Sequence, residues 1–379
     1  MSDTVSAPLN QYEAFEKTQQ ERAWSLTDVP FYEKGKGPNV YEWHNLDYLD
    51  YYDKVYGRKF GSNGIGKLCD VGLTRITEHE VPPLWDEDPV YYEATGVAQA
   101  GEIDIPKMQW QQENYANVLE EQGVNVHWIE YPDPPISAFG PMQHMWAAQE
   151  LLIVNGGSVI AKPGWNAFSF GRAEWLARNA FITLGIPPLV TVTGKGVNEA
   201  GASLFLAQDV FLTATSAAYN LDGVEQIMRP LRNTSGVPYL HFEIMNLPSQ
   251  VYFDPRTGIT AHPDMLIGPL DDRKVAIFSS GVPYETHMFL ARHGFETVEV
   301  DLGEHLQHCP ANLTILEPGK VVMQSESPKS VAAVRAAGIE VIEVPYSEFN
   351  KAGGGLACST QLIYREPGPA LGLESADQV

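Results

Sequence analysis

The sequence predicts an α/β fold in which five repeated units are arranged like the blades of a propeller. Three observations predict it. Five helix-like segments end at a glycine and continue into an alternating strand, and a pair of short apolar strands precedes each of the last four. The units recur about every 44–62 residues, as strand–strand–helix–strand. The glycine-rich turn of a dinucleotide-binding sheet is missing, which argues against a doubly wound arrangement.

The repeated helices are predicted from the residues that end them. A glycine follows each helix-like segment, at Gly123, Gly185, Gly236, Gly294 and Gly338. Glycine adopts the left-handed conformation that ends a helix without the steric penalty of other residues. We therefore expect a helix before each of these glycines and a strand after it.

The paired strands are predicted by their turns. Asn-Gly, Asp-Asp and Pro-Gly pairs separate short runs rich in β-branched and aromatic residues. Four hairpins are expected, at residues 151–162, 204–214, 265–280 and 313–325. The remaining unit has no hairpin in one piece, so we expect residues 66–77 to pair with residues 358–366 and to join the two ends of the chain.

The repeat defines the domain organisation. It lies within residues 66–379, which we interpret as the main domain. Residues 1–65, rich in Tyr and Trp, fall outside it. We expect them to form an extension packed on that domain, with a partner-binding segment as the alternative.

Composition and charge exclude several classes of function. The net charge of −23 argues against nucleic acid as a partner and against binding to anionic membranes. No apolar run approaches a membrane span, the polar N-terminus lacks the features of a signal peptide, and three cysteines suit a reducing cytoplasm. No zinc-spaced Cys/His set or nucleotide-binding loop occurs, so we expect no metal and no cofactor.

Three loops of the repeat carry a reactive side chain beside small residues. Glu199 precedes one hairpin, His308 precedes another, and Cys358 follows a glycine triplet. A thiol, an imidazole and a carboxylate at matching positions form a plausible nucleophile, base and orienting group. Taken singly, each residue is more typical of a structural or solvated role, and His305 competes with His308 for the role of base.

These loops resemble those of the guanidino-group-modifying, or pentein, superfamily, whose fold is a five-bladed α/β propeller. The resemblance covers roughly residues 66–366 and is closest to the glycine amidinotransferase branch. "GGGLACSTQLIYRE" is similar to that branch's cysteine loop, "HCPANLTILEPGKVVM" to its histidine loop and "NEAGASLFLAQDVFL" to its acidic loop.

The resemblance implies a role for each loop residue. Cys358 would be the covalent nucleophile, His308 the general acid/base, and Glu199 the carboxylate that orients the histidine. A covalent adduct divides attack on an unreactive carbon into two easier steps. The residues implied to bind the substrate are Glu150, Trp165, Arg172, Gly355 and Asn312. The resemblance also implies a small-molecule substrate. Members of the superfamily are often oligomers, so we also expect a homo-oligomer.

Departures from the family pattern concern the substrate. The family's histidine loop usually reads His-x-Asp, whereas this chain reads His308-Cys309-Pro310. The family's acidic loop usually carries a second Asp three residues after the first, and here that position is Ala202. Without these carboxylates a buried guanidinium would lose its charge partners. We therefore expect a neutral, planar, electron-poor carbon, such as that of a 2-nitroimidazole, and hydrolysis of a non-peptide C–N bond with release of nitrite and an imidazolone.

Two alternatives stay open at this point. The first is an amidinotransferase that moves an amidino group from arginine to an amine, which needs an adduct shielded from water. The second is a catalytically silent binding protein on the same scaffold. The missing carboxylates favour it, whereas the retained Cys358, His308 and Glu199 oppose it.

Overall fold

The structure is a computed structural model, and it divides the chain into two compact units, Met1–Asp50 and Tyr51–Val379. It describes residues 25–29, 31–38, 41, 58–77, 103–130, 136–137, 140–141, 151–162, 173–247 and 262–374. In the first unit the described residues contain a short 3-10 helix, η1 (Leu26–Asp28), which the Ser25 side chain caps. Our boundary at residue 65 stays a prediction.

The described part of the second unit contains five three-stranded sheets and one two-stranded sheet. The sheets, each written in its strand order, are β17 (Thr360–Arg365), β1 (Leu68–Thr74) and β2 (Asn125–Ile129); β5 (Leu151–Val154), β6 (Gly157–Ile160) and β7 (Pro188–Thr191); β8 (Leu204–Ala207), β9 (Val210–Thr215) and β10 (His241–Asn246); β11 (Ile267–Asp271), β12 (Lys274–Ile277) and β13 (Glu296–Glu299); β14 (Thr314–Glu317), β15 (Lys320–Gln324) and β16 (Glu340–Val344); and the pair β3 (Ile136–Ser137) and β4 (Gly140–Pro141).

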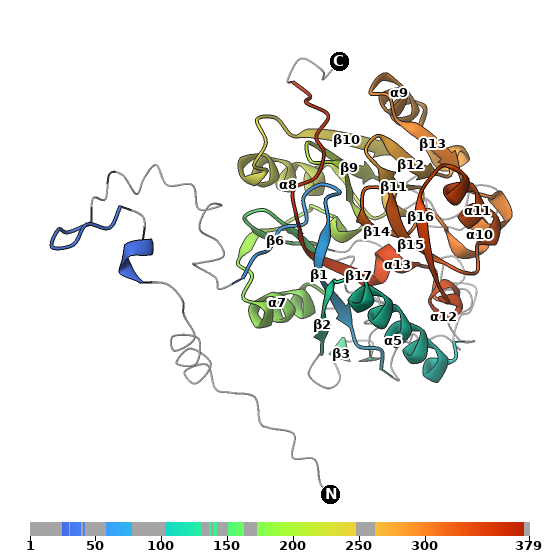
Figure 1. The fold of residues 1–379 in the computed structure, drawn as a ribbon, viewed down its shortest axis with the longest axis horizontal. Helices are drawn as coiled ribbons and strands as arrows, with labels where there is room; N and C mark the ends of the chain where they lie inside the picture. The colour runs from blue at the N-terminus through green and yellow to red at the C-terminus, as the bar shows by residue number, and fades with distance from the viewer. Residues whose placement is uncertain are drawn as a thin grey trace, which may run out of the picture. The chain divides into compact units, whose positions relative to one another are not determined.

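Helices connect the middle strand of each sheet to its third strand (Figure 1). They are α5 (Ile105–Glu121), α7 (Ala173–Leu184), α8 (Leu221–Thr234), α9 (Tyr284–Arg292) and α11 (Pro328–Ala336). Three shorter helices lie between units or before the last strand: α10 (Leu302–His308), α12 (Ser347–Lys351) and α13 (Leu356–Ser359). Short 3-10 turns complete the list: η5 (Ala200–Ala202), η6 (Pro263–Met265) and η7 (Ser279–Gly281).

The same topology recurs in the five sheets. In each, the first two strands pair antiparallel and the middle strand pairs parallel with the strand that follows the helix. The predicted hairpins and helices are therefore confirmed, as is the α/β class. The five predicted glycines all have positive φ, between 68° and 86°, because each is the left-handed residue that ends a helix.

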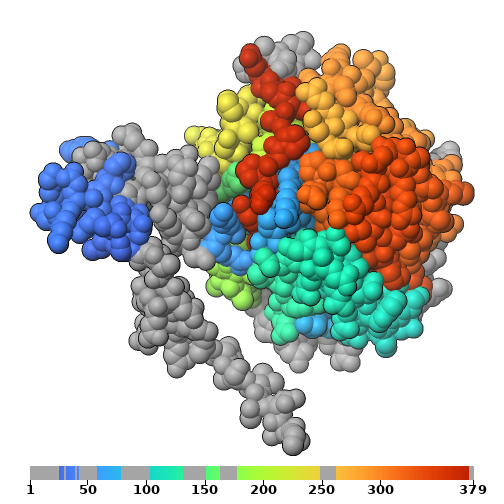
Figure 2. Space-filling view, viewed as in Figure 1, coloured from blue at the N-terminus to red at the C-terminus, as the bar shows by residue number. Residues whose placement is uncertain are grey.

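The split unit is also confirmed. Strand β17 pairs antiparallel with β1, and the register places Leu68 opposite Arg365. Figure 1 shows these two strands side by side although they come from opposite ends of the chain. Beyond β17, the amide N–H of Glu366 donates to the carbonyl of Lys67 at 2.9 Å. Figure 2 shows this C-terminal segment, in red, running over the molecular surface beside the blue segment that leads into β1.

A cavity of about 80 Å³ lies among the first strands of the five sheets. Strands β17, β5, β8, β11 and β14 each contribute residues to its wall. Most of the wall is apolar, and Asp264 and Arg365 are its charged members. Among the described residues no helix combines the length and the apolar character needed to span a membrane.

Candidate active site

Cys358 lies in α13, a single turn directly before β17. The residue is 1% exposed, and its backbone N–H donates to the side-chain Oδ1 of Asn312 at 3.2 Å. Gly355, which precedes the turn, packs so closely on Asn312 that a Cβ at this position would lie 2.8 Å from Asn312 Oδ1. A glycine is therefore needed here for Asn312 to reach the cysteine.

The Asn312 side chain joins the thiol to a carboxylate. Its Nδ2 donates to Cys358 Sγ at 3.1 Å and to Asp264 Oδ2 at 3.0 Å. Cys358 Sγ in turn lies 3.7 Å from Asp264 Oδ2. An amide N–H directed at sulfur stabilises a thiolate, which is the reactive form of cysteine.

Glu199 and His262 form a buried pair. Glu199 Oε2 and His262 Nε2 lie 2.7 Å apart, and the side chains are 0% and 7% exposed. The Tyr219 hydroxyl donates to the backbone carbonyl of Glu199, and the ring of Tyr219 packs edge-on against His262. Burial opposes protonation of the imidazole, but the Glu199 carboxylate outweighs it and holds the pKa of His262 above its usual value.

Asp264 connects this pair to the thiol. Burial raises the pKa of Asp264 to about 6, although His262 and Asn312 oppose that shift. Its Oδ2 accepts from Asn312, while Oδ1 is buried without a hydrogen bond to any residue that the structure describes. Asp264 thus offers an unused acceptor beside the sulfur atom of Cys358.

His308 lies at the end of α10 and is not the partner of Glu199. Glu199 Oε2 binds His262, and Glu199 Oε1 has no hydrogen bond within the described ranges. The contacts of His308 are made by its backbone: its carbonyl accepts hydrogen bonds from the side chains of Gln324 and Asn350. The expectation that Glu199 orients His308 is wrong.

Comparison of the sequence with known proteins identifies the family of this chain. A family model described as arginine deiminase matches residues 294–365. A 2-nitroimidazole nitrohydrolase from Mycobacterium sp. (strain JS330) is 36% identical over 359 residues, which cover 92% of this chain and 94% of that protein.

The chain belongs to the guanidino-group-modifying (pentein) superfamily. The predicted family and the predicted enzyme class, a hydrolase of non-peptide C–N bonds within it, are confirmed by this relationship.

Solved structures of the pentein superfamily share the fold. A dimethylarginine dimethylaminohydrolase (DDAH) from Pseudomonas aeruginosa in complex with citrulline is 18% identical, with a TM-score of 0.58, over 79% of this chain and 100% of that chain. An arginine dihydrolase domain of cyanobacteria bound to product is 16% identical, with a TM-score of 0.62, over 79% and 99%. An amidinotransferase from Microseira wollei is 12% identical, with a TM-score of 0.61, over 82% and 98%.

The pentein His-x-Asp pattern stands in a different loop from the one we predicted. The chain reads His262-Pro263-Asp264 directly before β11, and this His and Asp face Glu199 and Cys358. Pro310 therefore does not replace a carboxylate of the site, and its presence says nothing about the charge of the substrate. Ala202 does stand in the acidic loop, where it is buried.

His305, the other candidate for the general base, has the environment of a core residue. His305 is 0% exposed, and its ring stacks on Phe278 with ring centroids 3.7 Å apart. Burial lowers the pKa of His305 to about 4, so the imidazole is neutral at physiological pH. These contacts make His305 part of the core below α10.

The five predicted substrate-binding residues fall into two groups. Gly355 and Asn312 are brought together beside Cys358, as described above. Glu150, Trp165 and Arg172 lie outside the described residues. Within the described part of the chain, no group of three or more His, Cys, Asp or Glu side chains is arranged to hold a metal ion.

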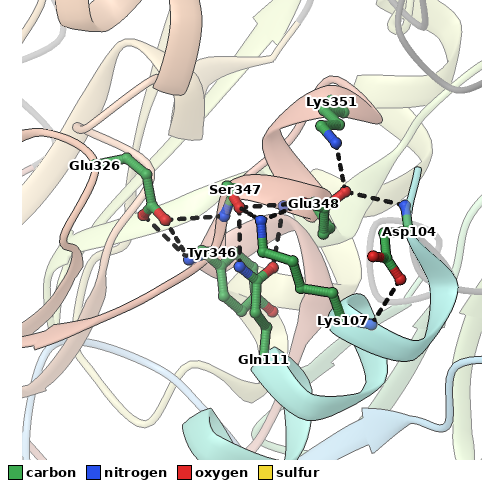
Figure 3. Close-up of polar contacts among 8 residues, drawn as sticks. All are labelled: Asp104, Lys107, Gln111, Glu326, Tyr346, Ser347, Glu348 and Lys351. Carbon is green, nitrogen blue, oxygen red and sulfur yellow. Dashed lines mark hydrogen bonds and ion pairs between the residues drawn. The ribbon is translucent and has the colours of Figure 1, made fainter. Parts of the chain in front are cut away.

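A buried carboxylate fixes the helix that leads to the cysteine loop (Figure 3). Glu348 of α12 has a side chain only 1% exposed, and its two oxygens lie 2.7 Å from Lys107 Nζ and 2.7 Å from Lys351 Nζ. Its Oε2 also accepts from the backbone N–H of Asp104, and its own N–H donates to Gln111. Helix α12 is therefore fastened to the first turns of α5.

The same helix reaches both sides of the site. Asn350 donates to the carbonyl of Gly354 at 3.0 Å and to Gln324 Oε1 at 2.8 Å. Gln324 in turn donates to the carbonyl of His308. The glycine loop before Cys358 and the end of α10 are therefore held in one hydrogen-bond network.

Proposed function

We propose that this protein hydrolyses a 2-nitroimidazole, with release of nitrite and the corresponding imidazolone. The observation that carries the proposal is its relationship to the mycobacterial 2-nitroimidazole nitrohydrolase, which extends over 92% of this chain and 94% of that protein. The buried thiol, its amide donor and the Glu199–His262 pair supply the groups that such a reaction needs.

The first step is attack by the Cys358 thiolate on C2 of the ring. A carbon–sulfur bond forms, and the carbon–nitrogen bond to the nitro group breaks with its electron pair, which leaves as nitrite. Asn312 Nδ2 stabilises the thiolate before the attack. Nitrite is a weakly basic leaving group, so this step needs no proton from an acid.

The second step is attack by water on the same carbon. We assign the general base to His262 rather than to His308, because Glu199 orients His262 and supports the imidazolium that forms. The water proton goes to His262, the carbon–oxygen bond forms, and the carbon–sulfur bond breaks to restore the thiolate. The proton on His262 then passes to the ring nitrogen, and the hydroxyl proton of the product is released as its carbonyl forms. The net reaction converts the nitroimidazole and water to imidazolone, nitrite and one proton.

Asp264 is the proposed substrate-binding carboxylate. Its buried Oδ1 suits the N–H of an imidazole ring placed over Cys358. We retain Asn312 and Gly355 as residues that shape the same site, and Glu150, Trp165 and Arg172 as predicted contacts.

The finer features of the architecture belong to the same proposal. A cavity wall built from the first strand of all five sheets supports a closed five-bladed propeller with the active site at one end of its axis. The division into a 1–65 extension and a 66–379 catalytic domain, the homo-oligomer and the cytoplasmic location stay predictions.

A panel of substrates tests the function. Nitrite and imidazolone should appear in equal amounts from 2-nitroimidazole with the wild-type protein and should not appear with Cys358→Ala. The His262→Asn variant should form the thioether adduct on Cys358 and fail to hydrolyse it, which mass spectrometry detects. Ornithine release from arginine in the presence of an acceptor amine, without nitrite from the nitroimidazole, would instead establish the amidinotransferase.

A further inference from the structure

Arg365, the last residue of β17, carries a buried positive charge. The residue is 4% exposed; Nη1 donates to the carbonyl of Gly66 at 3.0 Å and Nη2 to the carbonyl of Ile315 at 2.7 Å. Among the residues the structure describes, no carboxylate forms an ion pair with this guanidinium. Carbonyl oxygens satisfy N–H donors but leave the charge uncompensated, and an unpaired buried charge is strongly unfavourable.

The neighbours of Arg365 do not supply a negative charge. Burial lowers the pKa of Arg365 to about 10, so the guanidinium is still charged at neutral pH. Burial raises the pKa of the nearby Tyr115 to about 12, so this phenol is neutral. Cys69, the other neighbour, also has its thiol pKa raised by burial. The immediate surroundings of Arg365 therefore leave its positive charge unbalanced.

Arg365 is one of the residues that line the inner cavity, which also extends to residues beside the reaction centre. Asp264 and Ala357, beside Cys358, belong to the cavity wall together with Thr360, Gln361 and Arg365. Strand β17 runs along the cavity from Thr360 to Arg365, a distance of about 16 Å at the usual rise of a strand. The cavity thus has a carboxylate near the thiol and a cation further along β17.

We propose that this cavity is a binding site for a small monovalent inorganic anion, with Arg365 as its cationic group. In the reaction proposed above, on which this assignment of the ligand rests, the anion is the nitrite expelled at Cys358. The volume of about 80 Å³ suits an ion of this size with water, since about 10–15 Å³ measured in this way holds one water molecule.

The two charged residues of the cavity wall favour one position of a bound anion over another. Asp264 repels an anion from the thiol end, and Arg365 attracts it toward the other end. Nitrite held at Arg365 is removed from the adduct carbon and cannot attack it again before water does. Gln361 Oε1, buried in the wall without a hydrogen bond to a described residue, accepts from a water molecule that hydrates the anion.

Calorimetric titration with sodium nitrite at constant ionic strength tests the site on the full-length protein. We expect one saturable site in the wild type and in Cys358→Ala. Arg365→Met should weaken the binding by at least about 10-fold. Since Arg365→Met also removes two hydrogen bonds, Gln361→Glu is the second variant: it places a carboxylate in the cavity wall, and it should abolish nitrite binding in a folded protein. Nitrite should likewise raise the melting temperature of the wild type and leave that of Gln361→Glu unchanged.

The outcomes separate the two proposals. If the wild type does not hydrolyse 2-nitroimidazole but binds nitrite through Arg365, only the assigned function fails. If it hydrolyses 2-nitroimidazole but binds no nitrite, or binds it equally well in Gln361→Glu, the anion site is refuted. Binding that is lost in Cys358→Ala and retained in Arg365→Met would place the anion at the reaction centre and would also refute it.

Discussion

Replacement of Glu199 by glutamine isolates the charge of the buried carboxylate from its shape. Glutamine retains an acceptor oxygen for His262 Nε2, which now lies 2.7 Å from the carboxylate. Glu199 is 0% exposed, so solvent does not screen the pair. A hydrogen bond to a charged group contributes about 1.5–3 kcal/mol, and glutamine removes the charge from this one. The apparent pKa of His262 should therefore fall in Glu199→Gln.

The expected direction follows from the role of base. In the wild type Glu199 holds the pKa of His262 above its usual value, so the neutral imidazole is populated only at higher pH. Hydrolysis of the Cys358 adduct should rise with pH through that pKa. In Glu199→Gln the acid limb should move to lower pH, while the plateau rate falls on the order of 10-fold because a weaker base removes the water proton less effectively.

The acid limb of the pH–rate profile is measured from single-turnover breakdown of the Cys358 adduct, which mass spectrometry monitors between about pH 5 and pH 8. Glu243→Gln is a matched control, because Glu243 Oε2 lies 3.5 Å from the ring of His241 in a second His–Glu pair on β10. That variant should leave the limb in place. An acid limb that stays unmoved in an active, folded Glu199→Gln would refute His262 as the base.

Three further predictions concern the thiol, the choice of histidine and the support of the site. Asn312→Ala should slow alkylation of Cys358 by iodoacetamide on the order of 10–100-fold at neutral pH, measured on the Cys358 peptide, because the thiolate loses a donor at 3.1 Å; an unchanged rate contradicts this role. His262→Asn should lower turnover by about 10²–10⁴-fold, whereas His308→Asn should lower it by less than about 10-fold; the reverse order would restore His308 as the base. The Lys107 and Lys351 hydrogen bonds overcome the effect of burial and lower the pKa of Glu348 from 4.5 to about 2. About 3 kcal/mol of stability should therefore be present above pH 4.5 and be lost as the pH falls toward 2, in urea unfolding of the wild type but not of Glu348→Gln.

The repeated architecture was predictable because its signals are local. A glycine with positive φ ends each repeated helix, and Asn-Gly, Asp-Asp or Pro-Gly pairs lie at the turns of three of the four hairpins. These features act within about ten residues of sequence, so each unit can be recognised alone. Even the split unit followed, since four complete copies showed which strands the fifth copy still needed.

The choice of histidine failed for a different reason. His262 and His308 both precede the first strand of a unit, and the residue pattern of the two loops does not by itself tell which one meets Glu199. The spacing to the following strand distinguishes the two histidines. Glu199 and His262 each lie five residues before the first residue of β8 and β11, respectively, whereas His308 lies six residues before the first residue of β14. The position before β14 that faces the thiol is instead occupied by Asn312, whose amide binds both Cys358 and Asp264.

The charges of the assembled site favour a neutral substrate. The Glu199 carboxylate is matched by the imidazolium of His262, so the pair adds little net charge when both are ionised. Asp264 is then the remaining carboxylate of the site as described, and Ala202 supplies no second one. A guanidinium commonly takes two carboxylate contacts, whereas one N–H of a neutral ring needs one acceptor. Nitrite also leaves without a proton, so a site of this kind needs its histidine only as a base.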